Sequence, residues 1–338
     1  MSLDINRKII QKNAFRITKK RNKTAIRIRV PGGHLQTKYF SIIAQIAEEY
    51  GNGSVHITTR QGFEIPDIDF KFITEVNKLL APLINGLECS IGVSIDNPED
   101  GYPAAGIRNI SACIGNRVCP FANLDTTNLA LKMEKEVYPN NFHVKIAITG
   151  CPNDCIKAHL QDFGIIGMTE PQYIYNNCIG CEACVKVCTK SVTGALSLHN
   201  HKIKKDHRRC IGCGECILKC PTSAWVRSEK TFFRLIILGR TGKKNPRLAT
   251  TFLNWATEDV VIQVIKNIYA LIDKEIDKSL AKEHVGYIID RIGFNVFKAA
   301  VLKNVTLNKE IKVAQTLVFM GYQYEKDVFM NLLPHSTF

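Results

Sequence analysis

The chain has 338 residues, of which 45% are hydrophobic, and it carries a formal net charge of +14. This length predicts two or three domains, each able to bury a core. No apolar run reaches the roughly twenty residues that a membrane-spanning helix needs, and Met1–Arg7 lacks the apolar segment of a signal peptide, so we expect a soluble cytoplasmic protein with no membrane partner. Thirteen cysteines in such a chain indicate metal or cluster ligands rather than disulfides.

The positive charge is concentrated near the N-terminus. Residues 1–30 contain ten Lys or Arg residues and a single acidic residue, Asp4. Such a segment attracts anions, whether nucleic acid, a cofactor rich in carboxylates, a small oxyanion or an acidic protein partner. Composition does not choose among these, and each single charge is compatible with a solvated surface position.

Residues 1–95 alternate between strand and helix patterns, and we expect them to form one α+β unit. Apolar and basic residues alternate over Ala25–Val30, as in a strand, until Pro31 ends the pattern. The further predicted elements are a helix over His34–Tyr50, strands over Ser54–Thr59 and Gly62–Ile65, a helix over Phe70–Ile84 and a strand over Leu87–Ser94. This order is typical of a ferredoxin-like fold.

A second α+β unit is expected over residues 96–169 and 230–338, with a different segment inserted into it. Before the insertion we predict a helix over Pro120–Glu136, a strand over His143–Thr149 and a helix from Asn153. After it we predict a strand over Phe232–Leu238, a basic loop over Gly239–Arg247 and a helix over Glu258–Leu280. A helical tail over His284–Phe338 follows, which we assign to packing. The inserted residues, 170–229, hold eight cysteines and an internal repeat of about thirty residues. They are predicted to form a ferredoxin domain with two [4Fe–4S] clusters.

The inserted segment carries two cysteine runs with the same spacing, C-x2-C-x2-C-x3-C. This is the ligand pattern of a [4Fe–4S] ferredoxin, in which the last cysteine of each run binds the cluster of the other run. We therefore assign Cys178, Cys181, Cys184 and Cys220 to one cluster, and Cys210, Cys213, Cys216 and Cys188 to the other. Proline follows Cys220, as is usual, but Thr189 follows Cys188. Zinc is the competing interpretation, although tetrahedral zinc sites pair two separated C-x2-C knuckles.

Four further cysteines form a split set, Cys113, Cys119, Cys151 and Cys155. Their spacing alone indicates a metal or cluster site. Their context is more specific, because Arg108-Asn-Ile-Ser-Ala-Cys113, Cys119-Pro120 and Lys145-Ile-Ala-Ile-Thr-Gly-Cys151-Pro152-Asn153-Asp154-Cys155 resemble the sirohaem-binding signature of the nitrite and sulfite reductase family. Residues 31–34 and 57–61 resemble the small N-terminal repeat of that family, and residues 162–167 and 239–247 continue the likeness.

The resemblance implies the chemistry of the split set. In that family four such cysteines bind one cluster, and the last, here Cys155, is also the axial ligand of the sirohaem iron. We then expect three [4Fe–4S] clusters and a sirohaem, which serve the six-electron reduction of sulfite to sulfide, with electrons relayed through the ferredoxin-type clusters. The inserted ferredoxin and the short chain are most similar to the catalytic subunits of anaerobic, multi-subunit sulfite reductases. The sequence has no Gly-x-Gly-x-x-Gly fingerprint, and the resemblance implies two partners, a flavin- and NADH-binding reductase subunit and an iron–sulfur subunit.

The resemblance also implies where sulfite would bind. Sulfite is a dianion whose oxygens leave as water, so its pocket needs cations that bind the oxygens and donate protons. Arg60, Arg108 and Lys145 match two arginines and a lysine of the family. The position of a second lysine is His143 in this chain. His143 either serves as a cation and proton donor, since the ordinary pKa of histidine is about 6.5, or occupies a strand face without a catalytic role.

Sirohaem carries peripheral carboxylates, which need counter-charges and hydrogen-bond donors inside a protein. The candidates in the matching motif regions are Gln61, Asn116, Arg117, Arg240, Lys243, Lys244 and Arg247, each of which is equally compatible with an exposed surface position. As a group they explain the positive charge without a nucleic-acid partner. Three alternative functions stay open: a sirohaem nitrite reductase that makes ammonia, an iron–sulfur electron-transfer subunit without a substrate site, and an iron–sulfur protein that binds nucleic acid.

Overall fold

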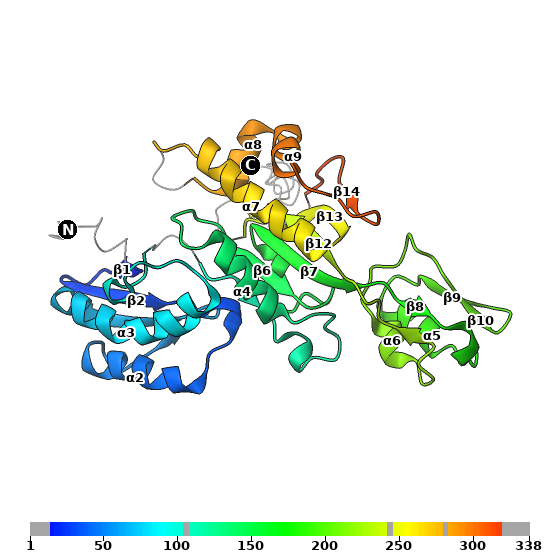
Figure 1. The fold of residues 1–338 in the computed structure, drawn as a ribbon, viewed down its shortest axis with the longest axis horizontal. Coiled ribbons are helices and arrows are strands. Elements are labelled where there is room, and N and C mark those ends of the chain that lie inside the picture. Colours follow the sequence, from blue (N-terminus) through cyan, green and yellow to red (C-terminus); the bar gives the residue numbers. More distant parts are fainter. Residues whose placement is uncertain (1–13, 104–107, 242–245, 280–282, 320–338) are drawn as a thin grey trace, which may run out of the picture.

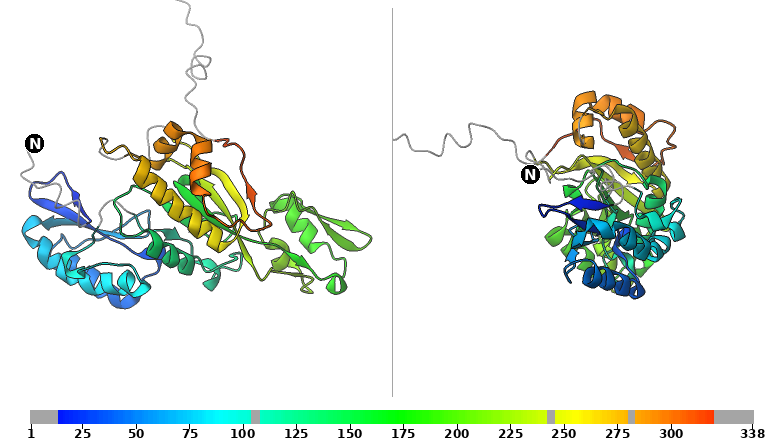
Figure 2. Two further views of the ribbon diagram at one scale, coloured as in Figure 1. Left: turned by 45° about the horizontal axis from the view of Figure 1, so that its top comes forward. Right: turned by 90° about the vertical axis from the view of Figure 1, so that its left-hand side faces the viewer.

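A computed structural model of the chain describes residues 14–103, 108–241, 246–279 and 283–319. These residues form three units in a row (Figure 1). The N-terminal unit lies at one end, a six-stranded sheet with its helices lies in the middle, and the cysteine-rich segment lies at the opposite end, as a second view also shows (Figure 2). The C-terminal helices return to the middle unit, so the order in space does not follow the order in the chain.

The N-terminal unit is a four-stranded antiparallel sheet with two helices packed on it (Figure 1). The strands lie in the order β1 (Phe15–Ile17), β2 (Lys23–Ile28), β4 (Phe63–Asp69) and β3 (His56–Ile57). The helices are α2 (Phe40–Glu49) and α3 (Ile73–Leu87), and their buried faces share one apolar core with the strands. This arrangement confirms the predicted ferredoxin-like fold.

One predicted strand of this unit is wrong. Residues 87–94 contain the end of α3 and a 3-10 turn over Cys89–Ile91. Leu87 stays helical because it continues the buried face that includes Leu80 and Ile84. The fourth strand is instead β1, which the sequence pattern did not predict and which pairs with β2.

The middle unit is built on a mixed sheet in the order β14-β13-β12-β7-β6-β5. The strand bounds are Ser111–Ala112 (β5), Ile146–Thr149 (β6), Phe163–Thr169 (β7), Thr231–Ile237 (β12), Thr250–Ala256 (β13) and Lys312–Val313 (β14). β5, β6 and β7 are parallel, and the other neighbours are antiparallel. Every residue of β6 and β7 is buried, as expected for strands covered on both faces.

Four helices complete the core of the middle unit: α4 (Thr126–Val137), α7 (Glu258–Glu275), α8 (Val285–Ile292) and α9 (Phe294–Val301). α4 begins later than predicted because the Asp125 side chain accepts a hydrogen bond from the backbone N–H of Asn128 and caps the helix there. α8 and α9 confirm that the part of the C-terminal tail described here packs on the core; residues 320–338 lie outside the described residues.

No helix begins at Asn153, contrary to the prediction. The Asp154 carboxylate accepts hydrogen bonds from the backbone N–H groups of Ala158 and His159, which compete with helical hydrogen bonds. Asp154 and Lys157 both have a left-handed backbone, which interrupts a helix. The segment after β6 is therefore a series of turns, followed by a 3-10 turn over Ala158–Leu160.

Residues 170–229 leave the middle sheet after β7 and return to it in β12, and these two strands pair directly. The segment between them contains β8 (Gln172–Tyr173), α5 (Ala183–Ser191), β9 (Leu196–His199), β10 (Lys202–Lys205), α6 (Glu215–Lys219) and β11 (Trp225–Val226). β8 pairs with β11 and β9 pairs with β10, which closes a small core of its own. Within the described ranges, the model has no helix with the length and apolar character to cross a membrane.

Candidate cluster sites and anion pocket

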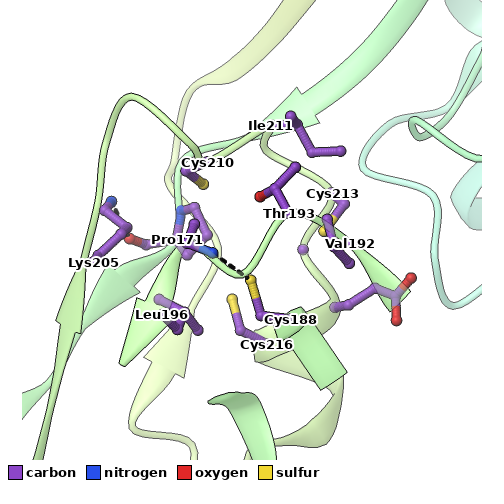
Figure 3. Close-up of a pocket in the computed structure, with 13 residues that line it drawn as sticks. Pro171, Cys188, Val192, Thr193, Leu196, Lys205, Cys210, Ile211, Cys213 and Cys216 are labelled. Atoms are coloured by element: carbon purple, nitrogen blue, oxygen red, sulfur yellow. Dashed lines mark hydrogen bonds between the residues drawn. The ribbon is translucent and has the colours of Figure 1, made fainter. Parts of the chain in front are cut away.

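The second cysteine run and one cysteine of the first run line a pocket of about 360 Å³ (Figure 3). Cys210, Cys213 and Cys216 come from the loop before α6 and from its first turn, and Cys188 comes from the last turn of α5. The backbone N–H of Ala195 donates to Cys188 Sγ at 3.2 Å, the dashed line in Figure 3. The structure thus brings together the four cysteines predicted to bind one cluster, which we call the second set.

The other four cysteines of this segment, Cys178, Cys181, Cys184 and Cys220, form the first set. Cys184 is buried on α5, and its thiol lies close enough to that of Cys220 for their charges to interact. Cys220 is the C-cap residue of α6, and its sulfur accepts a hydrogen bond from the backbone N–H of Ala224 at 3.1 Å. α5 packs against α6, so each helix contributes to both sets. Cys181 is exposed.

The split set lies at the edge of the middle sheet where β5 and β6 end. These strands are parallel neighbours, so the loops that follow them, with Cys113 and Cys151, meet at the same edge. The Cys151 thiol lies within electrostatic reach of Cys113, Cys119 and Cys155. The backbone N–H of Gly150 donates to Cys113 Sγ at 3.1 Å, and Cys155 is exposed.

Most of the buried thiols resist ionisation. Burial raises the pKa of Cys213 to about 11, and burial also raises the pKa values of Cys151, Cys184, Cys210 and Cys216. Because a cysteine binds metal as a thiolate, a bound cation must stabilise the charge. In the described part of the chain, no three His, Cys, Asp or Glu side chains are placed to hold one metal ion. Such an arrangement is compatible with a cuboidal cluster, because each cysteine then binds a different iron and the ligand sulfurs lie farther apart than around a single ion.

Cys220 differs from the other thiols. Burial acts to raise the pKa of its thiol, but backbone hydrogen bonds from Thr222, Trp225 and Ala224 outweigh burial and lower the pKa below its ordinary value. Hydrogen bonding to the charged form of an acid favours ionisation. Cys220 is therefore prepared to act as a thiolate ligand.

A separate pocket of about 1000 Å³ lies between the N-terminal and middle units. Its lining contains four cations and no acid among the described residues, and consists of Arg27, Thr58, Thr59, Arg60, Arg108, Asn109, Lys145, Leu160, Gln161 and Thr241. Within the described ranges, the buried Nη1 atom of Arg108 has no hydrogen-bond partner. A buried donor without an acceptor is costly, so this pocket, which we call the anion pocket, is suited to a ligand with negatively charged oxygens.

Arg60 is fixed in the wall of the anion pocket. Its Nη1 donates to Gln161 Oε1 at 2.7 Å, and its Nη2 donates to the backbone oxygens of Asn109 and Ile146 at 2.8 and 2.5 Å. Burial lowers the pKa of Arg60 to about 10, and the charge of Asp162 opposes that effect. The guanidinium therefore keeps its charge at neutral pH.

His143 lies outside the residues that line the anion pocket. Its ring packs edge-on against that of His284, with ring centroids 4.4 Å apart. His284 is buried at the start of α8, with Nδ1 3.5 Å from Asp162 Oδ1. Asp162 Oδ2 in turn accepts a hydrogen bond from the backbone N–H of Lys145 at 2.8 Å. The catalytic role of His143 stays a prediction, and the sequence analysis did not single out His284, because it lies in the tail assigned to packing.

The predicted sirohaem-carboxylate contacts fall into different surroundings. Lys243 and Lys244 lie outside the described residues. Asn116 and Arg117 are exposed in the loop between Cys113 and Cys119. Arg117 also contacts the protein, since its Nη2 donates to Thr127 Oγ1 at 2.7 Å and its Nε lies 3.7 Å from Asp125 Oδ1. A role of Asn116 and Arg117 in carboxylate binding stays a prediction.

The remaining candidates also make contacts within the protein. Gln61 makes two hydrogen bonds, of 2.7 and 2.8 Å, to the backbone of Ala112 and thereby joins the N-terminal unit to β5. Arg240 and Arg247 pair with Asp290 of α8 at 3.0 and 2.9 Å. These contacts have structural roles, and a role in carboxylate binding stays a prediction for all three.

Three residues of the anion pocket were not predicted from the sequence: Arg27, Asn109 and Gln161. Asn109 Nδ2 donates to the backbone oxygens of Val30 and Arg60 at 3.0 and 2.6 Å, so it holds the two walls of the pocket together. The available signal was position: Asn109 follows Arg108, and Gln161 precedes the Asp162-Phe163-Gly164 motif.

Three cysteine quartets together with a cationic pocket place this chain among the iron–sulfur oxidoreductases. The model of the nitrite and sulphite reductase 4Fe-4S domain matches residues 104–309, and that of the nitrite/sulfite reductase ferredoxin-like half domain matches residues 17–83. The chain therefore belongs to the nitrite and sulfite reductase family.

Individual relatives agree with this assignment. The C subunit of the anaerobic sulfite reductase of Salmonella typhimurium is 44% identical over 94% of this chain and 95% of its own length. The coenzyme F420-dependent sulfite reductase of Methanocaldococcus jannaschii is 31% identical over 53% of this chain and 27% of its own length. The crystal structure of dissimilatory sulfite reductase I has a similar fold, with a TM-score of 0.64 at 16% identity over 92% of this chain and 78% of that one. The predicted family, the similarity to anaerobic sulfite reductase C subunits and the fold class are thus confirmed.

Proposed function

We propose that this chain carries out the six-electron reduction of sulfite to sulfide at a sirohaem, with electrons delivered through three [4Fe–4S] clusters. The anion pocket carries the proposal, because Arg60, Arg108 and Lys145 line it and Arg108 Nη1 has no acceptor among the described residues. Sulfite oxygens would supply that acceptor. The similarity to a relative named as part of an anaerobic sulfite reductase supports sulfite as the substrate.

The residues present fit the proposed cofactors. Each cysteine set offers four thiols, and in each set at least one sulfur accepts a backbone N–H, for example Cys113 from Gly150, Cys188 from Ala195 and Cys220 from Ala224. Such hydrogen bonds tune the reduction potential of an iron–sulfur cluster. Sirohaem, when bound through the exposed thiolate of Cys155, would supply the iron centre that takes sulfite. The exposed Asn116 and Arg117 are candidate partners for its carboxylates, in which case Arg117 would exchange its contacts with Thr127 and Asp125 for the ligand.

The cations of the anion pocket have distinct tasks in this proposal. Arg60 is a fixed positive charge, because three protein oxygens hold its guanidinium in place. Arg108 binds the substrate through its unpaired Nη1. Lys145, whose backbone is anchored on Asp162, donates protons to the oxygens that leave as water. The anion pocket thereby binds the dianion and compensates negative charge as electrons arrive.

The proposal also includes a division of the chain into three domains. Residues 1–95, residues 96–169 with 230–338, and the inserted residues 170–229 form three domains in this proposal. The direct pairing of β7 with β12 supports an insertion, since it leaves the sheet intact around the inserted segment. A flavin- and NADH-binding subunit and an iron–sulfur subunit in the cytoplasm supply the electrons; the Salmonella relative is named as one subunit of several, which supports such a complex.

Anaerobic purification followed by spectroscopy and kinetics tests the proposal. We expect a tetrapyrrole absorption spectrum, EPR signals of three clusters and a higher steady-state rate with sulfite than with nitrite. The Arg108→Met variant should lose about 10- to 100-fold in kcat/KM for sulfite, the equivalent of one charged hydrogen bond of about 1.5–3 kcal/mol. Arg234→Met is the matched control, because Arg234 is half-buried on β12 and lies outside the lining of the anion pocket.

The results also separate the alternative functions. A much higher rate with nitrite than with sulfite would identify nitrite as the substrate. Intact clusters without a tetrapyrrole would indicate an electron-transfer subunit instead. Equal effects of the two arginine substitutions would refute the role of the anion pocket.

A further inference from the structure

Asn123 lies between the split set and the second set. It is 8% exposed, and its backbone N–H donates to the carbonyl oxygen of Gly150, the residue before Cys151, at 2.7 Å. Its Nδ2 donates to the carbonyl oxygen of Gly212, inside the second cysteine run, and to that of Gly167 on β7, each at 3.4 Å. One buried residue thus connects the backbones of the two cysteine-bearing loops.

Arg227 reinforces this junction from the inserted segment. Its Nε donates to Asn123 Oδ1 at 3.3 Å, and its Nη2 donates to the carbonyl oxygen of Pro120, the residue after a split-set cysteine, at 3.0 Å. Gly212 also accepts a hydrogen bond from the backbone N–H of Thr169 at 3.0 Å. The two loops are therefore held at a fixed separation by backbone and side-chain contacts together.

The loop of the second set approaches the middle unit closely. A Cβ atom on Gly212 would lie 3.0 Å from both Met168 Cβ and the Thr169 oxygen of β7, and the left-handed backbone of Gly212, with φ +69°, also favours glycine. The second set therefore faces the middle unit. Only a residue without a side chain allows this approach.

The first cysteine run faces the opposite way. Gly180 in this run lies against the backbone of His201, in the turn between β9 and β10 at the outer end of the segment (Figure 1). Cys181 is exposed, and the neighbouring Ile179 and Tyr175 are 68% and 60% exposed. The three sets therefore form a series, with the first set outermost and the split set innermost.

We propose that Asn123 is the positioning residue for electron transfer from the second set to the split set, and that electrons enter the chain at the first set. This inference rests on the proposed function, because it requires clusters bound by these cysteines. In each transfer the second-set cluster is oxidised by one electron and the split-set cluster is reduced by one, with no bond made or broken. A reduced flavin of the partner subunit, or a chemical reductant of low potential, then supplies a new electron to the second-set cluster through the first set.

Rapid mixing of the anaerobic holoprotein with less than one equivalent of dithionite tests the proposal in the absence of sulfite. Freeze-quench EPR then follows the reduction of each cluster with time. Asn123→Leu keeps the side-chain volume but removes the hydrogen bonds to Gly212, Gly167 and Arg227. We expect reduction of the split-set cluster to slow by at least about tenfold, since a misplacement of about 1 Å can cost a hundredfold in a reaction that depends on geometry. Iron content and the three reduction potentials should not change.

Asn77→Leu is the matched control. Asn77 is 4% exposed and donates to the Asp100 carbonyl oxygen at 3.1 Å, in the N-terminal unit. We expect wild-type transfer rates in this variant. Should Asn123→Leu fail to load its clusters, Arg227→Met removes, from an exposed position, the two hydrogen bonds by which the inserted segment holds Asn123 Oδ1 and the Pro120 carbonyl oxygen, and slower transfer is expected there too.

Wild-type transfer rates in a fully loaded Asn123→Leu or Arg227→Met variant would overturn the inference, whatever the substrate proves to be. Sulfite turnover by the wild type, measured separately, decides the proposed function. A protein without sirohaem that still shows transfer dependent on Asn123 would refute the proposed function and leave the inference standing.

Discussion

Replacing Arg29 with methionine should destabilise the N-terminal unit strongly, because Arg29 is the cation paired with two buried carboxyl groups. Its side chain is 2% exposed, and it pairs with Glu88 at 2.8 Å and Glu134 at 2.5 Å, both fully buried. Its guanidinium also lies over the ring of Tyr138, 3.9 Å from the centroid. Glu134 comes from α4 in the middle unit, and its other oxygen accepts the backbone N–H of Ile110 at 2.6 Å. One arginine thus joins the N-terminal unit to the loop that carries a wall of the anion pocket.

The expected loss follows from the burial of the three charges. Removing one partner of a buried pair leaves an uncompensated charge and costs about 3–5 kcal/mol. We therefore expect Arg29→Met to lower the opening free energy of β2 by about 3–5 kcal/mol at pH 8. Arg27→Met is the matched control two positions earlier, on β2, because Arg27 and its partner Glu64 are 17% and 15% exposed. Since water still screens such a pair, the control should lose at most about 1 kcal/mol.

Amide hydrogen exchange of β2 measures this opening free energy without assuming that the whole chain unfolds in one step. Burial raises the pKa of Glu88 to about 7, against the opposing charge of Arg29. Below that pH Glu88 is largely neutral, so the loss caused by Arg29→Met should be smaller at pH 6 than at pH 8. A loss below about 1 kcal/mol at pH 8, no larger than that of the control, would refute the reasoning.

Three further predictions follow from individual contacts. The pKa of Glu88 rises from 4.5 to about 7 on folding, so the wild type should lose up to about 3 kcal/mol of stability as the pH rises through that window. Glu88→Gln should lack this loss. Urea midpoints that change in parallel for the two proteins from pH 5 to 8 would contradict the prediction. Gly167→Ala would place a Cβ 2.0 Å from Leu124 Cδ2, which should cost about 1–3 kcal/mol and lower the melting temperature with partial loss of acid-labile sulfide. Cys188→Ala should remove the cluster of the second set and with it about four irons per chain. Cys89 lies outside all three sets, so Cys89→Ala should retain all iron. Loss of the first-set EPR signal in Cys188→Ala, in place of the second-set signal, would refute the assignment of Cys188.

The sequence predicted those elements whose apolar period is long and regular. α7 and β12 appear close to their predicted places, because each has a continuous buried face. Two predictions were wrong where side-chain contacts decide the backbone. Residues 87–94 are apolar enough for a strand, but packing extends α3 to Leu87. The segment from Asn153 forms turns because the Asp154 carboxylate takes up backbone donors, and a periodicity argument does not include that contact.

The candidate sites also differ in whether neighbouring or distant residues of the sequence define them. The two cysteine runs of the inserted segment could be recognised because their spacing is local, and only the exchange of the fourth cysteine needed a general rule. The split set combines two distant pairs, so its assignment to one cluster needed the family resemblance. The anion pocket was predicted through Arg60, Arg108 and Lys145, whereas its other walls depend on how the N-terminal unit docks on the middle unit. The contact between His143 and His284 joins residues 141 positions apart. No local pattern encodes such a pair.

The distribution of charge distinguishes a small oxyanion from a nucleic acid as the anion that this chain attracts. Five of the seven Lys and Arg residues in positions 14–30 pair with carboxylates: Arg16 and Arg27 with Glu64, Lys20 with Asp67, Lys23 with Asp69, and Arg29 with Glu88 and Glu134. Paired charges project little field beyond their partners. Nucleic acid needs an extended row of available cations along its phosphates, and in the described part of this basic segment most cations are paired with carboxylates of the same unit. The anion pocket differs, since Arg60, Arg108 and Lys145 line it together with the paired Arg27, and none of its described lining residues is acidic. A ligand of a few atoms with concentrated negative charge matches that geometry better than a long polyanion.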